Sequence, residues 1–303
     1  GGMSVCAQLV SPQNEGLFQK AIIESGFFKS PYGRIAMQYS MEEAEKTGQE
    51  FFRQLGVKTL AEARRLSAGF VLKKALESHI FWGSVDDGKF LPGKYEELMF
   101  QTRMPVPILF GHTTDEFLMK PNVASIEAFK KTIACYGNKA ERILQLCHAD
   151  EGIDAVNRNS AVSENEVALR SLCVSEDRRG INVPKYYYRF GATLPGPDHP
   201  GAFHSSDLWF FFETLAKCWR PFRGPHYDLA RIMCNYWANF VKSGDPNGQD
   251  DDGTPMPEWP AYTEKDPYIM FLHENKNKLG AKRNEPDELI KIFIDYNAID
   301  NGK

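Results

Sequence analysis

The sequence predicts an α/β fold in which a mostly parallel sheet is flanked by helices. Short runs rich in β-branched and aromatic residues alternate with longer stretches whose apolar residues recur at helical spacing. This alternation is typical of parallel strands joined by crossover helices. No internal repeat interrupts the 303 residues. We therefore expect one domain, or part of one.

Each element is expected from its own local pattern. Strands are expected at 20–23, 106–110, 185–190 and 268–272, and helices at 40–55, 126–133 and 229–241. The last helix has the clearest boundaries, because Pro225 lies before it and the turn-forming stretch 244–248 ends it. A further helix is expected directly after Gly1 and Gly2.

Composition excludes several classes of partner. With 42% hydrophobic and 25% charged residues, the chain has the balance of a soluble globular protein. A formal net charge of -4 offers no cationic field for a phosphate backbone, which argues against nucleic acid and suits a small neutral substrate. No apolar run approaches the roughly 18 residues of a membrane helix, so no membrane partner is expected.

Cysteine usage predicts a reducing compartment and no metal. The six cysteines are widely scattered and no Asn-x-Ser/Thr site occurs, which together favour the cytoplasm. Cys135, Cys147 and His148 lack the second close pair that a zinc site usually has. We expect neither a metal nor a cofactor.

Two loop residues suggest acid–base chemistry. Glu116 follows the apolar strand that includes 106–110, and His204 follows the strand at 185–190 after a loop rich in glycine and proline. In open α/β sheets, ligands bind beyond the carboxyl ends of the strands. Either residue alone could be an ordinary loop residue, but an acid followed by a histidine is also the order found in α/β-hydrolases.

The nucleophile that such a pair would serve is not found. A serine hydrolase of this type carries its serine on a Gly-x-Ser-x-Gly turn between a strand and a helix. The nearest candidate is Ser4, which has Gly2 before it but Cys6 after it. The helix expected after Gly2 is in the position of the helix that follows such a turn.

Several segments, in order along the chain, carry a resemblance to a known family. They are 9–12, 16–18, 21–26, 85–92, 111–116, 203–208, 231–240, 244–247 and 259–260. Together they resemble the C-terminal part of a type-B carboxylesterase, the family that includes cholinesterases and bacterial para-nitrobenzyl esterases. The resemblance covers nearly the whole chain.

The resemblance implies an α/β-hydrolase fold, with residues 1–303 as the C-terminal part of a single domain. In the family the nucleophile turn reads Gly-Glu-Ser-Ala-Gly, so the serine would lie two residues before Gly1. The N-terminal strands, the nucleophile turn and the oxyanion hole would then belong to an N-terminal segment of the same protein. A small-molecule ester would be the substrate.

The resemblance also assigns roles. His204 would be the general base and Glu116 the acid that orients it. Asp115 is an alternative acid, because Phe117 stands where the family usually has glycine. Ser25 and Asp207 resemble a serine and a carboxylate that support the triad from behind, although turn chemistry or a structural role would also account for them.

The expected substrate pocket combines a roomy acyl site with aromatic walls. Ser78 and Ile80 align with the aromatic residues that restrict the acyl pocket of cholinesterases, which implies space for a bulky acyl group. Phe81, Trp82 and Trp209 are expected to line the same apolar gorge, or else to belong to the core.

The predicted function is that of a serine carboxylic-ester hydrolase acting through an acyl-enzyme. The alternative is a non-catalytic cholinesterase-like binding or adhesion module, as in neuroligins, against which the presence of both Glu116 and His204 argues. A lipase or amidase would share the mechanism and differ in substrate.

Overall fold

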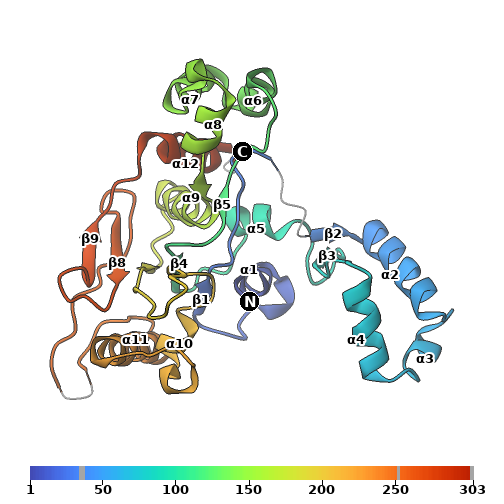
Figure 1. The fold of residues 1–303 in the computed structure, drawn as a ribbon, viewed down its shortest axis with the longest axis horizontal. Helices are drawn as coiled ribbons and strands as arrows, with labels where there is room; N and C mark the ends of the chain where they lie inside the picture. The colour runs from blue at the N-terminus through green and yellow to red at the C-terminus, as the bar shows by residue number, and fades with distance from the viewer. Residues whose placement is uncertain (34–37, 251–252, 301–303) are drawn as a thin grey trace.

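A five-stranded sheet forms the centre of the molecule (Figure 1). The structure is a computed structural model that describes residues 1–33, 38–250 and 253–300. In spatial order the strands are β1 (Ala21–Glu24), β4 (Ile108–Thr113), β7 (Lys185–Phe190), β8 (Tyr268–Leu272) and β9 (Gly280–Arg283). The first four strands run parallel, and only β9 is antiparallel. The predicted mostly parallel sheet is confirmed.

The register of the sheet brings the ends of its strands together. Glu24 of β1 lies beside Gly111 of β4, which lies beside Tyr188 of β7. Because these strands are parallel, their carboxyl ends share one edge of the sheet, and the loops after them meet there. Beyond β1, on the side away from β4, no further strand pairs within the described ranges.

Alternating side chains build a core on each face of the sheet. Leu109, Tyr186 and Tyr188 face α10 (Leu208–Phe211) and α11 (Gly224–Ser243). The other face carries Ile108, Phe110 and Tyr187 toward three helices. These are α1 (Gly2–Val10), α5 (Tyr95–Gln101) and α9 (Glu164–Arg178). The sheet is therefore the middle of three layers.

Two groups of elements lie outside these layers. One packs around α12 (Glu288–Asp300), which contacts α9, and includes α6 (Ile126–Ile133), α7 (Ala140–Leu146) and α8 (Ile153–Asn159). The other is an extension to one side of the sheet (Figure 1). It comprises β2 (Gln38–Ser40), α2 (Met41–Leu55), α3 (Leu60–Ala63), α4 (Ala68–Glu77) and β3 (Ser84–Asp86).

The short elements complete the chain. A two-stranded sheet joins β5 (Leu118–Met119) to β6 (Val162–Ser163). The 3₁₀ helices among the described residues are η1 (Pro12–Asn14), η2 (Ala134–Lys139), η3 (Ala149–Glu151) and η4 (Leu215–Lys217). None of the described helices is both long and apolar enough to cross a membrane.

The expected elements are found, with shifts at some boundaries. Strands 185–190 and 268–272 and helix 126–133 have the predicted limits. β4 starts two residues later than predicted, because Pro107 has no N–H to donate to the ladder. α11 starts five residues earlier than predicted, since proline is tolerated in the first turn of a helix and Pro225 lies there.

The start of α1 is held against the end of β1 by two glycines. A Cβ atom on Gly26 would overlap the backbone of Gly2, and a Cβ on Gly2 would lie 2.6 Å from the Glu24 carbonyl oxygen. Only glycine at both positions permits this contact. It places the first residues of the chain at the same sheet edge as the loops after β1 and β4.

We expect Gly26→Ala to lower the free energy of unfolding by about 3 kcal/mol, because backbone overlap forces α1 away from β1. Gly48→Ala is the matched control. Gly48 lies inside α2 with open space around it, so alanine there should stabilise by about 0.5–1 kcal/mol. Urea unfolding of both variants checks this, and equal stability of Gly26→Ala and the parent would contradict the packing described.

Candidate active site

Glu116 lies in the tight turn after β4 and its carboxylate is fixed from both sides. The side chain is fully buried. Its Oε1 accepts the backbone N–H of Thr113 at 3.1 Å. The other oxygen, Oε2, points to His204.

His204 is delivered by the loop after β7. Its Nδ1 lies 2.6 Å from Oε2 of Glu116, a short hydrogen bond between loops 88 residues apart in sequence. The imidazole is 45% exposed, and the bond at Nδ1 leaves Nε2 for another partner. A buried carboxylate thus orients a solvent-accessible imidazole, which is the arrangement of a general base with its supporting acid.

Asp115 holds the histidine loop in place. Its Oδ2 accepts the backbone N–H of Ala202 at 2.8 Å, and its own N–H donates to the Ala202 carbonyl at 3.1 Å. Gly201, with φ +66°, lies close enough that a Cβ would press on this carboxylate. The structure therefore brings Glu116, and not Asp115, into contact with His204.

Asp207 lies at the end of the same loop, directly before α10. Its Oδ2 accepts the Tyr188 hydroxyl at 3.0 Å, and its carbonyl accepts the N–H groups of Phe210 and Phe211 in the single turn of α10. Burial raises the pKa of this carboxyl to about 6. Asp207 thus ties the histidine loop to β7 and α10.

Glu24 is a partly buried carboxyl at this edge that the sequence reading missed. Its Oε1 accepts the indole N–H of Trp237 at 2.7 Å. Burial raises the pKa of Glu24 to about 7, and the negative charge of Asp207 adds to the effect. Its position at the carboxyl end of β1 was the available signal, but its partner lies 213 residues away.

Ser25 is buried at the exit of β1, where its φ is +46°. Its backbone N–H donates to the Gly111 carbonyl at 2.9 Å. Its hydroxyl has no hydrogen-bond partner within the described residues. Ser25 therefore fixes the β1 turn through its backbone.

The predicted pocket residues separate into three places. Phe81 and Trp82 line a hollow of about 400 Å³ beside α1. The Ser78 hydroxyl donates to the Ala75 carbonyl at 2.8 Å, at the end of α4, and accepts the Ile80 N–H at 3.2 Å. Trp209 packs edge-on against Phe203, 5.8 Å between ring centres. Among the described residues, the hollow beside α1 is lined by Phe81 and Trp82 but not by Ser78, Ile80 or Trp209.

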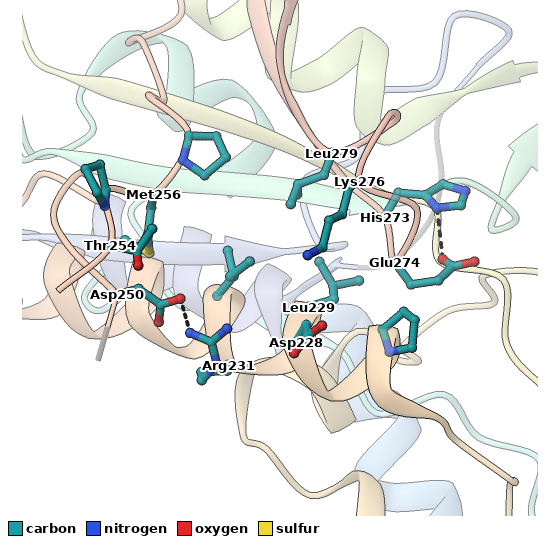
Figure 2. A pocket seen from close by; sticks show the side chains of 14 residues that line it. Asp228, Leu229, Arg231, Asp250, Thr254, Met256, His273, Glu274, Lys276 and Leu279 are labelled. Carbon is teal, nitrogen blue, oxygen red and sulfur yellow. Dashed lines mark hydrogen bonds and ion pairs between the residues drawn. The ribbon is translucent and has the colours of Figure 1, made fainter. Parts of the chain in front are cut away.

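A second His–Glu pair lies in another hollow, of about 380 Å³, between α11 and the β8–β9 connection (Figure 2). His273 Nδ1 is 2.9 Å from Glu274 Oε2. Both ring nitrogens are engaged, because Nδ1 accepts the Asn275 N–H at 3.1 Å and Nε2 lies 3.4 Å from the Lys278 ammonium. His273 therefore lacks the free nitrogen that His204 has.

Neither a metal site nor a disulfide is found in the described part of the chain. No group of three or more His, Cys, Asp or Glu residues there could hold a metal ion. None of the six cysteines, each in a described segment, forms a disulfide. The groups positioned for chemistry are Glu116 and His204.

The raised pKa of the Glu24 carboxyl predicts how stability depends on pH. Its pKa rises from 4.5 to about 7 on folding, so the folded chain binds the proton more tightly, and stability falls as pH rises through that window. Glu24→Gln keeps an acceptor for Trp237 but cannot ionise. We expect the variant to lose this pH dependence, gaining up to about 3 kcal/mol relative to the parent between pH 4.5 and 7.

Urea unfolding from pH 4 to pH 8 measures the effect. Glu15→Gln, which removes an exposed carboxyl, is the control and should follow the parent. A Glu24→Gln curve parallel to that of the parent over the whole range would contradict the assignment.

The fold is shared with solved esterase structures. A structure titled PNB esterase superposes with a TM-score of 0.67 over 97% of this chain and 60% of its own, at 23% identity. A thermophilic PNB esterase gives a TM-score of 0.66 over 96% of this chain and 60% of its own, at 23% identity. The α/β-hydrolase fold predicted from the sequence is confirmed.

Sequence comparison gives the same relationship. Human cocaine esterase is 26% identical over 297 residues, covering 89% of this chain and 52% of that protein. Para-nitrobenzyl esterase of Bacillus subtilis is 27% identical over 294 residues, covering 90% of this chain and 56% of that protein. The chain spans about half the length of these curated relatives.

A family model described as the carboxylesterase family matches residues 1–164 and 159–289. These two matches cover most of the chain and include both Glu116 and His204. The chain belongs to the carboxylesterase family.

Proposed function

We propose that this chain supplies the acid and the base of a serine carboxylic-ester hydrolase that works through an acyl-enzyme. The single observation that carries the proposal is the 2.6 Å hydrogen bond between the buried Glu116 carboxylate and the accessible His204 imidazole. Relatives whose names state ester hydrolysis, cocaine esterase and para-nitrobenzyl esterase, support it.

In the proposed reaction, Nε2 of His204 takes the proton of a serine hydroxyl as its oxygen attacks the ester carbonyl carbon. The bond from that carbon to the alcohol oxygen then breaks, and the oxygen leaves with the bonding electrons and the proton from His204. Water repeats the two steps on the acyl-serine, which releases the acid. Glu116 keeps the proton of His204 on Nδ1 and stabilises the imidazolium.

The nucleophile is proposed to lie two residues before Gly1, on an N-terminal segment of the same protein that also provides the oxyanion hole. The position of α1 supports this. Its first residue, Gly2, packs against Gly26 at the carboxyl end of β1, so a residue just before Gly1 would lie at the edge that carries Glu116 and His204. The unpaired side of β1 is where preceding strands would add to the sheet.

We expect Glu116→Gln to lower kcat by about 10⁴-fold in the protein that joins this chain to its N-terminal segment, because an amide no longer fixes the imidazole tautomer. His204→Ala should cost at least as much. His199→Asn is the control, since His199 is exposed in the same loop. Hydrolysis of para-nitrophenyl acetate measures all three variants, and full activity of Glu116→Gln would contradict the proposed acid.

The acyl pocket is proposed to be roomy, with Ser78 and Ile80 at its wall. We expect para-nitrophenyl esters of longer or aromatic acids to be accepted, and Ile80→Phe to shift the preference toward acetate by filling that space. The ratio of kcat/KM along a series of acyl lengths measures this. Activity confined to acetate in the parent protein would contradict the roomy pocket.

A further inference from the structure

Phe117, directly after Glu116, has an unusual backbone conformation. Its φ is +32°, a region in which a bulky side chain is a true outlier. The chain is fixed on both sides of it. The preceding turn is held by the Asp115 pairing with Ala202, and the following residues, Leu118 and Met119, pair with β6. Such strain persists only where the surroundings impose it, and it is concentrated at functional sites.

The Phe117 ring lies against the imidazole. The two ring centres are 4.6 Å apart and their planes are inclined by 53°. On its other side Phe117 meets the buried Phe28 edge-on, with ring centres 6.0 Å apart and an angle of 80°. Phe117 is nevertheless 51% exposed. The exposed Phe117 ring, backed by the buried Phe28, therefore forms an apolar wall beside His204.

The chemistry of the base decides which part of an ester would meet this wall. In acylation, Nε2 of His204 gives its proton to the oxygen of the departing alcohol. The group attached to that oxygen is thus held next to the imidazole. In deacylation the same place is taken by water, which has no such group.

We propose that Phe117, backed by Phe28, selects esters whose alcohol part carries an aromatic ring. This inference rests on the proposed esterase function and adds a substrate class to it. An aromatic alcohol can pack edge-on or offset against Phe117 in the geometry that Phe117 already uses with Phe28. A small alkyl alcohol gains less, because it lacks both the area and the ring.

The test compares benzyl acetate with ethyl acetate in the protein that joins this chain to its N-terminal segment. Both esters give the same acyl-enzyme, so the ratio of their kcat/KM values reports only on the alcohol. Phe117→Leu keeps an apolar side chain and removes the ring, and should lower the benzyl-to-ethyl ratio about 3- to 10-fold. Phe117→Tyr restores the ring and should keep the ratio of the parent.

Phe212→Leu is the matched control, because Phe212 is an exposed aromatic residue at the end of α10 whose ring packs on Phe211. It should leave the ratio unchanged. An equal loss for both esters in Phe117→Leu would make Phe117 a purely structural residue and overturn the inference, as would an unchanged ratio. Failure of the parent protein to hydrolyse either ester would instead contradict the proposed function itself.

Discussion

The hydrogen bond between Glu116 and His204 depends on the parallel register of the sheet. The two residues are 88 positions apart, and they meet because β4 and β7 end at the same edge with matched registers. Each loop is then fixed by its own contacts, Thr113 for the acid and Asp115 for the histidine loop. The contact of Thr113 with Glu116 is local to its turn, but the contacts of Asp115 with the histidine loop and of Glu116 with His204 need the shared edge. The sheet therefore brings Glu116 and His204 together.

Three consecutive residues make different contacts at this edge. Asp115 binds the backbone of the histidine loop, Glu116 binds the imidazole, and Phe117 covers one side of that imidazole. The tight turn after β4 and the positive φ of Phe117 direct these side chains differently. Behind them, the buried Asp207 and the partly buried Glu24 add two carboxyls with raised pKa values, so the negative charge of this edge grows as pH rises toward 7.

The sheet, and Glu116 and His204 as candidates that meet at its edge, could be predicted from the sequence because both leave local signals. Apolar runs mark the strands, and Glu116 and His204 each follow one. The other hydrogen-bond partners of the carboxylates at this edge could not be predicted, because they depend on tertiary contacts. Nothing local tells Asp115 from Glu116 as the acid, and the bond from Trp237 to Glu24 spans 213 residues. The aromatic residues expected in one gorge are separated: Phe81 and Trp82 line the hollow beside α1, whereas Trp209 packs against Phe203.

The most direct test of the account is to locate the nucleophile. A protein that joins this chain to the proposed N-terminal segment would be treated with a fluorophosphonate, which forms a covalent bond with an activated serine, and the labelled peptide would be identified by mass spectrometry. The account predicts one labelled serine, two residues before Gly1, and loss of labelling in His204→Ala. A label on another serine, or labelling that persists without His204, would contradict the assignment of this chain as the acid–base half of a serine esterase.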